Sequence, residues 1–314
     1  MSDLDPAPAA SACAAEPAAT ATWQSRPARL TDLEGLAIRR LLPLRGRRLV
    51  GPWCFLDHFG PLAFEGRPMD VGPHPHIGLQ TVSWLLEGEL LHHDSLGCSA
   101  LATPGTLNLM TAGRGIAHSE ETPASNSGRL HGVQLWVALP DHARQGEPAF
   151  EHHAELPRIA AGDGTATVVM GACGGVRSPA RAFSPLVAVD LAGEEGATLR
   201  LPLVPEWEHA LVLLRGALAL EGRALEPDAL CDLGRGRAEL CLSAQAPGTR
   251  ALLIGGAPFA ESILMWWNFV ARTNDEIAAA RADWEAHRRF PEVAGYRGAR
   301  IPAPPFVARV VPGR

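Results

Sequence analysis

Short runs of alternating apolar and polar residues, each bounded by turn-forming residues, fill most of the chain after its first two dozen positions. In residues 78–88, Val82, Trp84 and Leu86 alternate with the residues between them, and the run ends at Gly88. Side chains two apart project from one face of a strand, so this period predicts β-structure. Similar segments predict a strand and turn over 90–97 and strands over 106–110 and 130–139. Short strands with frequent turns are typical of an antiparallel sandwich or barrel.

The second half of the chain repeats this layout. The run that ends at Gly216 parallels the run that ends at Gly88, and Pro227-Asp228 parallels the turn at Pro104-Gly105. These parallels predict two similar barrels, although any two strand-rich domains share such features. Strands of the second barrel are predicted over 167–170, 186–191, 197–203, 209–214, 217–220 and 251–254.

Changes in composition suggest the domain boundaries. Residues 1–22 are rich in Ala, Pro, Ser and Thr, which predicts a disordered tail. A first, metal-binding barrel is expected at 23–140 and a polar, loop-like linker at 141–165. A second barrel without metal ligands is expected at 166–260, followed at 261–314 by a short helix and an extended tail.

One helix is predicted near the end of the chain. Thr273-Asn-Asp-Glu276 has the pattern of a capping box, and good helix formers follow it as far as Arg289. Arg288 and Arg289 then lie where the helix dipole favours cations, and Pro291 ends the helix. We expect this helix to serve packing, so the fold class remains all-β.

Composition excludes several kinds of function. The formal net charge is −6, and no basic patch with interleaved aromatic residues appears, which argues against direct nucleic-acid binding. The chain contains no lysine, so Schiff-base chemistry at a lysine is excluded. The six cysteines match no zinc pattern, and no apolar run approaches the roughly 18 residues that span a bilayer. The first residues do not resemble a secretory signal, and we therefore expect a cytoplasmic protein.

Two short segments carry the strongest chemical signal. His74-Pro75-His76 places two imidazoles on one strand face, and His118-Ser119-Glu120, which begins 42 residues after His76, does the same for an imidazole and a carboxylate. Ten of the twelve histidines lie between His58 and His153, which makes a chance pairing less probable. Together the four side chains form a candidate site for a divalent transition metal.

Other residues near these segments have less definite predictions. Gln134 and His131 are candidates to hydrogen-bond the ligand imidazoles, with a buried structural role as the alternative for His131. Arg114 is expected either to guard the entrance or to be solvated. An apolar pocket mouth or plain core is expected at Phe55, Trp84, Met110 and Ile116. The remaining histidines of the cluster are expected to be satisfied core or surface residues; they are His58, His92, His93, His142, His152 and His153.

Several longer segments resemble the pirin family of the cupin superfamily. The most specific are His74-Pro-His-Ile-Gly-Leu79 and Met110-Thr-Ala-Gly-Arg-Gly-Ile-Ala-His-Ser-Glu120, and the similarity extends over about residues 25–290. The resemblance implies two stacked cupin barrels. It also implies iron, most readily Fe(II), held in the first barrel by His74, His76, His118 and Glu120. Gln80 departs from the family pattern, which is often acidic there, so the charge of the site depends on Glu120.

The resemblance implies three alternative functions. The first is a quercetinase-type dioxygenase that cleaves a flavonol with O2 and releases carbon monoxide, with Glu120 accepting the proton of the flavonol 3-hydroxyl. The second is a non-enzymatic, iron-binding redox sensor that binds protein partners. The third is a cupin isomerase or a degenerate sugar-binding barrel. The same four ligands serve the first two, so the sequence does not separate them.

Overall fold

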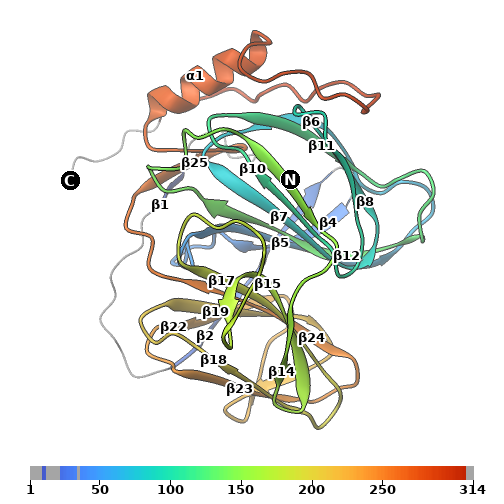
Figure 1. Cartoon of the computed structure of the whole chain (residues 1–314), viewed down its shortest axis with the longest axis vertical. Helices are drawn as coiled ribbons and strands as arrows, with labels where there is room; N and C mark the ends of the chain where they lie inside the picture. The colour runs from blue at the N-terminus through green and yellow to red at the C-terminus, as the bar shows by residue number, and fades with distance from the viewer. Residues whose placement is uncertain (1–8, 12–21, 34–35, 309–314) are drawn as a thin grey trace.

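The computed structural model describes residues 9–11, 22–33 and 36–308, which are mostly β-strand. Two β domains are stacked on each other, and the helix α1 (Asn274–Glu285) lies across the far side of the first domain (Figure 1). Each domain consists of one large and one small antiparallel sheet. The predicted all-β class with two stacked domains and a short C-terminal helix is confirmed.

The first domain packs a seven-stranded sheet against a four-stranded one. The large sheet contains, in spatial order, β13 (Ala149–His153), β10 (Leu107–Thr111), β7 (Leu79–Gly88), β12 (Arg129–Ala138), β5 (Trp53–Ala63), β4 (Leu36–Leu42) and β3 (Arg29–Leu33). The small sheet contains β6 (Asp70–His76), β11 (Ile116–Glu121), β8 (Leu90–Asp94) and β9 (Ser99–Ala102).

The second domain has the same layout. Its large sheet contains β14 (Arg158–Ala161), β15 (Gly164–Cys173), β17 (Leu186–Gly193), β24 (Thr249–Gly256), β19 (Glu208–Arg215), β22 (Ala229–Gly234) and β2 (Gln24–Pro27), with β16 (Val176–Arg177) paired to β15. Its small sheet contains β18 (Thr198–Pro202), β23 (Glu239–Ala244), β20 (Leu218–Leu220) and β21 (Arg223–Ala224).

Apolar side chains form separate clusters inside and between the domains. Phe55, Met110 and Trp136 belong to the interior of the first domain. The interior of the second domain is lined by leucine and valine and, among the described residues, contains no group of candidate metal ligands. A third cluster joins the facing large sheets, with Leu135 from the first and Ile254 from the second. Along the strands of the large sheets, alternate side chains therefore point into the interior of their own domain and into the interface between the domains.

Segments from both ends of the chain cover the small sheet of the first domain from outside. The three strands there are β25 (Ile263–Trp266), β26 (Phe269–Ala271) and β1 (Ala9–Ser11). The buried side of α1, at Ile277, Ala280 and Trp284, packs with Ile77 and Ala117. Since Ala117 and His118 point to opposite faces of β11, this outer cluster supports the strand that carries His118.

The structure corrects several sequence predictions. The segment 141–165 is not loop-like throughout, because β13 extends the large sheet of the first domain and β14 pairs with β15 of the second. Although residues 23–140 were assigned to the first barrel, β2 pairs with β22 of the second. In the predicted tail, residues 9–11 form β1 on β25, whereas 1–8 and 12–21 lie outside the described residues.

The helix prediction is confirmed at its start and wrong at its end. Thr273 is the N-cap, and its side chain and that of Glu276 form the reciprocal capping box. The helix ends at Glu285, so its last turn contains no basic residue, and Arg288 and Arg289 lie beyond it. Helix-forming composition therefore extends further than the helix itself, and His287, just beyond it, has a positive φ of 53°.

Candidate metal centre

Two neighbouring strands bring the predicted histidines together. β6 and β11 pair antiparallel, with His118 opposite His74 and Ile116 opposite His76. The register shifts after His118, and Ser119 lies in this irregularity. On the other side of β11, β8 places Asp94 opposite His118 and His92 opposite Glu120. The period of two turns the named histidines, Asp94 and Glu120 toward the interior of the first domain.

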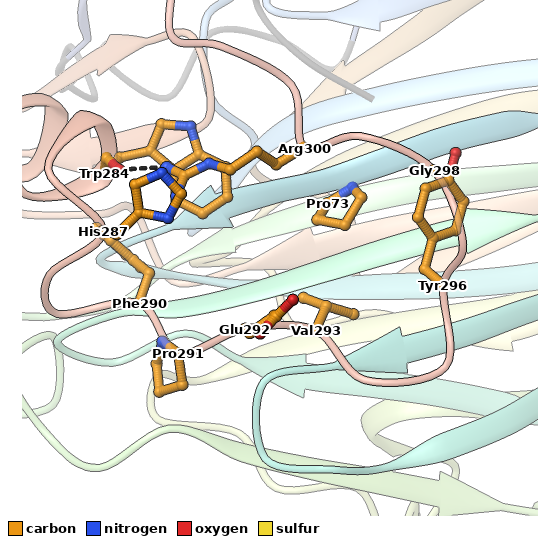
Figure 2. Close-up of a pocket in the computed structure, with 10 residues that line it drawn as sticks. All are labelled: Pro73, Trp284, His287, Phe290, Pro291, Glu292, Val293, Tyr296, Gly298 and Arg300. Carbon is orange, nitrogen blue, oxygen red and sulfur yellow. Dashed lines mark hydrogen bonds between the residues drawn. The ribbon is translucent and has the colours of Figure 1, made fainter.

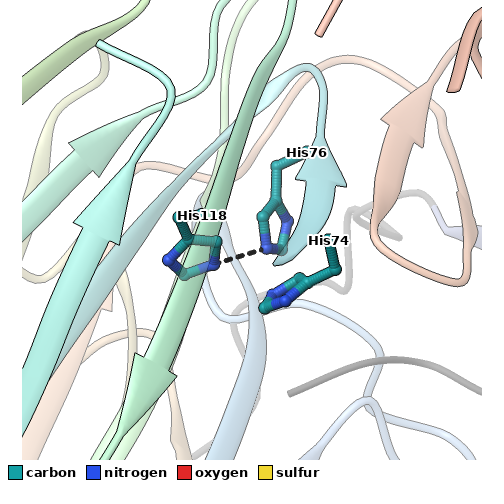
Figure 3. Close-up of side chains that lie close together, drawn as sticks. All are labelled: His74, His76 and His118. Atoms are coloured by element: carbon teal, nitrogen blue, oxygen red, sulfur yellow. Dashed lines mark hydrogen bonds between the residues drawn. The ribbon is translucent and has the colours of Figure 1, made fainter. Parts of the chain in front are cut away.

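His74, His76 and His118 converge on one point (Figure 3). Their ligand atoms all lie within 4.8 Å of one another. The Nε2 atoms of His76 and His118 are 3.0 Å apart. Two ligand atoms at right angles, each about 2.1 Å from a metal, are about 3.0 Å apart, so this spacing suits adjacent positions around one ion. The exposed fraction of each residue is at most 1%.

The second nitrogen of each ring shows which atom is available to a metal. Nδ1 of His74 lies 2.9 Å from the carbonyl oxygen of Gly72, and Nδ1 of His76 lies 3.0 Å from that of Asn268. A carbonyl oxygen only accepts hydrogen bonds, so Nδ1 carries the proton and Nε2 presents a lone pair. Nε2 of His74 is buried and has no partner among the described residues. This unpaired acceptor is the kind of atom that a cation satisfies.

Burial keeps these imidazoles neutral. Desolvation lowers the pKa of His74 to about 3 and the pKa values of His76 and His118 well below the ordinary value. Neighbouring imidazoles lower the pKa values of His76 and His118 further. Only a neutral imidazole coordinates a metal, so the site is ready to bind near neutral pH. The three residues therefore fit a divalent transition metal.

Glu120 lies in the same interior but outside the compact group of three. Its Oε1 accepts hydrogen bonds from the Ser83 hydroxyl at 3.2 Å and from Nε2 of Gln134 at 3.3 Å, both on the opposite sheet. Its Oε2 is buried and has no partner among the described residues. The carboxylate thus has one anchored oxygen and one oxygen free for a metal or a proton.

His92 and Asp94 are the residues that sequence reasoning missed. Nδ1 of His92 lies 3.2 Å from Nδ1 of His118, and its Nε2 lies 3.1 Å from Oδ2 of Asp94. Sequence analysis assigned His92 no role toward the ligands. The signal was present, because His92 and Asp94 are two apart on a strand, as are His74 and His76.

The other predicted residues have mixed outcomes. Phe55, Met110 and Ile116 are buried in the interior of the first domain, and Phe55 stacks on Trp136, whose ring lies 5.2 Å from His76. Trp84 is on the opposite face, where Nε1 donates to Asp190 of the second domain, so it cannot line the site.

Gln134 supports Glu120 and not an imidazole. His131 faces His58, with their Nε2 atoms 2.9 Å apart, and contacts none of the three ligand histidines. Gln80 donates to Thr111 and to the Arg181 carbonyl, away from the group of three. Arg114 pairs with Glu147 in solvent.

A cavity of about 400 Å³ lies outside β6, between this strand and the segment that follows α1 (Figure 2). Pro73 forms one wall, while Trp284, Tyr296 and Arg300 form others. Pro73 precedes His74 and points to the opposite face, so a molecule in this cavity would be separated from the histidines by the strand itself. The cavity therefore does not serve as the metal centre.

Comparison with known proteins identifies the family. Residues 35–137 match the family model described as Pirin, and residues 188–291 match the Pirin C-terminal cupin domain. The chain belongs to the pirin family. The two stacked domains are accordingly the two cupin domains of a bicupin, as the resemblance implied.

Similar pirin-family proteins cover nearly the whole chain. A Pseudomonas aeruginosa protein provisionally named a quercetin 2,3-dioxygenase is 48% identical over 87% of this chain and 86% of its own. A pirin-like protein of Caulobacter vibrioides is 39% identical over 88% and 97%. The crystal structure of a quercetin 2,3-dioxygenase from Acinetobacter baumannii superimposes with a TM-score of 0.86, at 44% identity over 93% and 96%.

The helices of the described residues were compared with the length and hydropathy of a membrane span. Within residues 22–33 and 36–308, no helix has the length and apolar character needed to cross a bilayer.

Proposed function

We propose that this protein is a metal-dependent dioxygenase of the quercetinase type, which cleaves a flavonol with O2 and releases carbon monoxide. The observation that carries the proposal is the convergence of three neutral imidazoles on one buried point, with each Nδ1 hydrogen-bonded away from it. The Acinetobacter baumannii structure with this fold and 44% identity bears the name of that activity.

His74, His76 and His118 would hold the metal, and we propose Fe(II) as the natural ion. A divalent metal bound there supplies Lewis acidity toward the flavonol oxygen atoms and the redox chemistry that O2 requires. Trp136 and Phe55 form an apolar wall beside His76 that excludes water and suits an aromatic substrate.

Glu120 would act as the base and as a fourth ligand. Ser83 and Gln134 fix Oε1, and the unpartnered Oε2 can accept the proton of the flavonol 3-hydroxyl. Because Oε2 has no partner in the described structure, the carboxylate would also balance part of the charge of a bound cation.

The test combines metal analysis with turnover. Elemental analysis of the purified protein is followed by transfer of quercetin from anaerobic to aerobic conditions, with O2 uptake and carbon monoxide measured. We expect both, and we expect His76→Ala to lose the metal. Glu120→Gln keeps the shape but removes the base, so turnover should fall by about 10²–10⁴-fold.

The matched control is His93→Gln, which changes the neighbouring histidine on the outer face of β8. His93 lies 3.6 Å from Glu121 and contacts none of the three ligands in the described structure. Its turnover should stay unchanged. A metal-loaded protein that consumes no O2 and releases no carbon monoxide with any flavonol would refute the enzymatic function.

One observation favours the second function, an iron-binding regulator with protein partners. The three imidazoles are at most 1% exposed, and none of them lines the cavity beside Pro73 or the smaller one beside Ile77. This burial favours a redox change at the metal, which needs no bulky ligand, over the binding of a flavonol. Partner capture that depends on Fe(II) versus Fe(III), without turnover, supports the regulator, and capture insensitive to the iron state counts against it.

A further inference from the structure

A hydrogen-bonded chain extends from the metal centre to a tight turn after β8. His118 contacts His92 through the two Nδ1 atoms at 3.2 Å, and His92 contacts Oδ2 of Asp94 through Nε2 at 3.1 Å. Oδ1 of Asp94 accepts from the backbone N–H groups of Leu96 and Cys98 at 2.8 and 3.0 Å. Both oxygens of this fully buried carboxylate are therefore used.

When a metal occupies Nε2 of His118, only one assignment of donors and acceptors satisfies these hydrogen bonds. The proton of His118 is then on Nδ1 and is donated to Nδ1 of His92. His92, which accepts at Nδ1, then carries its proton on Nε2 and donates it to Asp94, which only accepts. Each contact thus joins one donor to one acceptor, and the anchored carboxylate fixes the tautomer of both rings.

We infer that His92 and Asp94 are positioning residues that hold His118 in its metal-binding orientation and tautomer. The inference rests on the proposed metal site. A carboxylate that accepts from a ligand imidazole raises the basicity of that ligand and limits its rotation. In this protein the Asp94 carboxylate acts through an intervening histidine, His92. The hydrogen bonds of Asp94 to the backbone connect His118 to the turn at Leu96.

The packing around His92 is consistent with this role. His92 is 3% exposed, and its ring stacks on Phe150 with centroids 4.4 Å apart and planes 13° apart. Phe150 belongs to β13, the strand that extends the large sheet. The His92 ring is therefore held by stacking on Phe150 as well as by hydrogen bonds at both of its nitrogens. The proposed proton transfer to Glu120 does not involve it.

Asp94→Asn is the sharpest test, because it preserves shape and reverses one hydrogen bond. The amide oxygen can still accept from Leu96 and Cys98, so its NH2 group faces His92. His92 must then accept at Nε2 and carry its proton on Nδ1, where it opposes the Nδ1 proton of metal-bound His118. We expect affinity for zinc(II), measured by competition with a chromophoric chelator, to fall about 10–100-fold.

Two comparisons separate positioning from general damage. His93→Gln, on the other face of the same strand, should leave zinc affinity unchanged. In a His118→Ala background, Asp94→Asn should cause no further loss, because the ligand on which it acts is absent. An unchanged affinity in Asp94→Asn, or an equal loss in both backgrounds, overturns the inference.

A spectroscopic measurement reads the tautomer directly. In the zinc-loaded protein, nitrogen-15 NMR should show the proton of His92 on Nε2, and Asp94→Asn should move it to Nδ1. A His92 proton on Nδ1 in the unchanged protein overturns the inference. Because neither experiment contains a flavonol, a failure to cleave quercetin contradicts the proposed activity alone.

Discussion

His58 and His131 form a second buried histidine pair, near the contact between the two domains. Their Nε2 atoms are 2.9 Å apart, and the residues are 3% and 0% exposed. Burial is the main cause that lowers the pKa of His58 to about 3 and of His131 to about 4. Arg215 of the second domain lowers the pKa of His131 further.

This pair should make the metal-free protein sensitive to acid. The unfolded chain binds these protons near pH 6.5 and the folded protein only near pH 3–4. The unfolded state therefore holds more protons between those values, and stability is lost as pH falls through this window. Each histidine contributes up to about 1.4 kcal/mol per pH unit to the slope.

A double variant, His58→Leu with His131→Leu, tests this expectation. Replacing both partners leaves no unpaired polar group, so stability at pH 7 should change little. Urea unfolding between pH 7 and pH 4.5 should show a shallower decline than in the unchanged protein, while His142→Leu at an exposed position should keep the original slope. Equal slopes in all three proteins would show that the pair does not titrate on unfolding.

For single residues, the sequence predicted the candidate ligand side chains better than the groups that hydrogen-bond to them. His74, His76 and His118 were predicted because a strand period of two is visible in the sequence itself, and the structure brings these three together. The role of Glu120 as a ligand stays a prediction. Asn268 could not be predicted as a partner of His76, because the contact uses its backbone carbonyl from a distant segment.

At the scale of helices and strands, the sequence predicted a helix start from neighbouring residues but did not predict which strands form the edges of the sheets. The capping box at Thr273 was predicted because its two partners, Thr273 and Glu276, lie three residues apart in the sequence. β13 and β2 were missed as sheet members because each lies at the edge of a large sheet, and neither strand has a buried residue or an alternating burial pattern. The strand that provides Phe150 to His92 was therefore mistaken for a linker.

The cap of α1 should contribute measurably to stability. The Thr273 side chain accepts from the Glu276 backbone, and the helix that it starts covers the outer face of β6 and β11 through Trp284. Thr273→Ala should lower the free energy of unfolding by about 1 kcal/mol, as measured by urea unfolding. Thr273→Ser keeps the accepting oxygen and should restore most of the loss. An equal loss in both variants would assign the effect to packing.

At the scale of the whole molecule, the two domains are joined by buried polar contacts as well as by apolar surface. Glu208 of β19 accepts from the Gly51 backbone at 2.7 Å and pairs with Arg47 at 3.1 Å. Nε1 of Trp53 donates to the Gly255 carbonyl at 3.0 Å. β2, from the start of the chain, lies in the second domain. We therefore expect both domains to unfold in one transition.

Glu208→Ala tests whether this junction holds the two domains together. The variant leaves the Arg47 guanidinium without its closer carboxylate and the Gly51 N–H without an acceptor. Arg47 keeps Asp232 at 3.4 Å, so the expected loss of unfolding free energy, about 3 kcal/mol, is at the lower end for a broken buried pair.

Tryptophan fluorescence and far-ultraviolet circular dichroism should remain coincident in urea for the unchanged protein and separate in Glu208→Ala, where one domain can unfold first. The matched control is Glu239→Ala, which breaks the ion pair with Arg200, in which both side chains are 55% exposed. Its loss should stay below about 1 kcal/mol. A Glu208→Ala protein no less stable than this control would mean that apolar contact alone joins the domains.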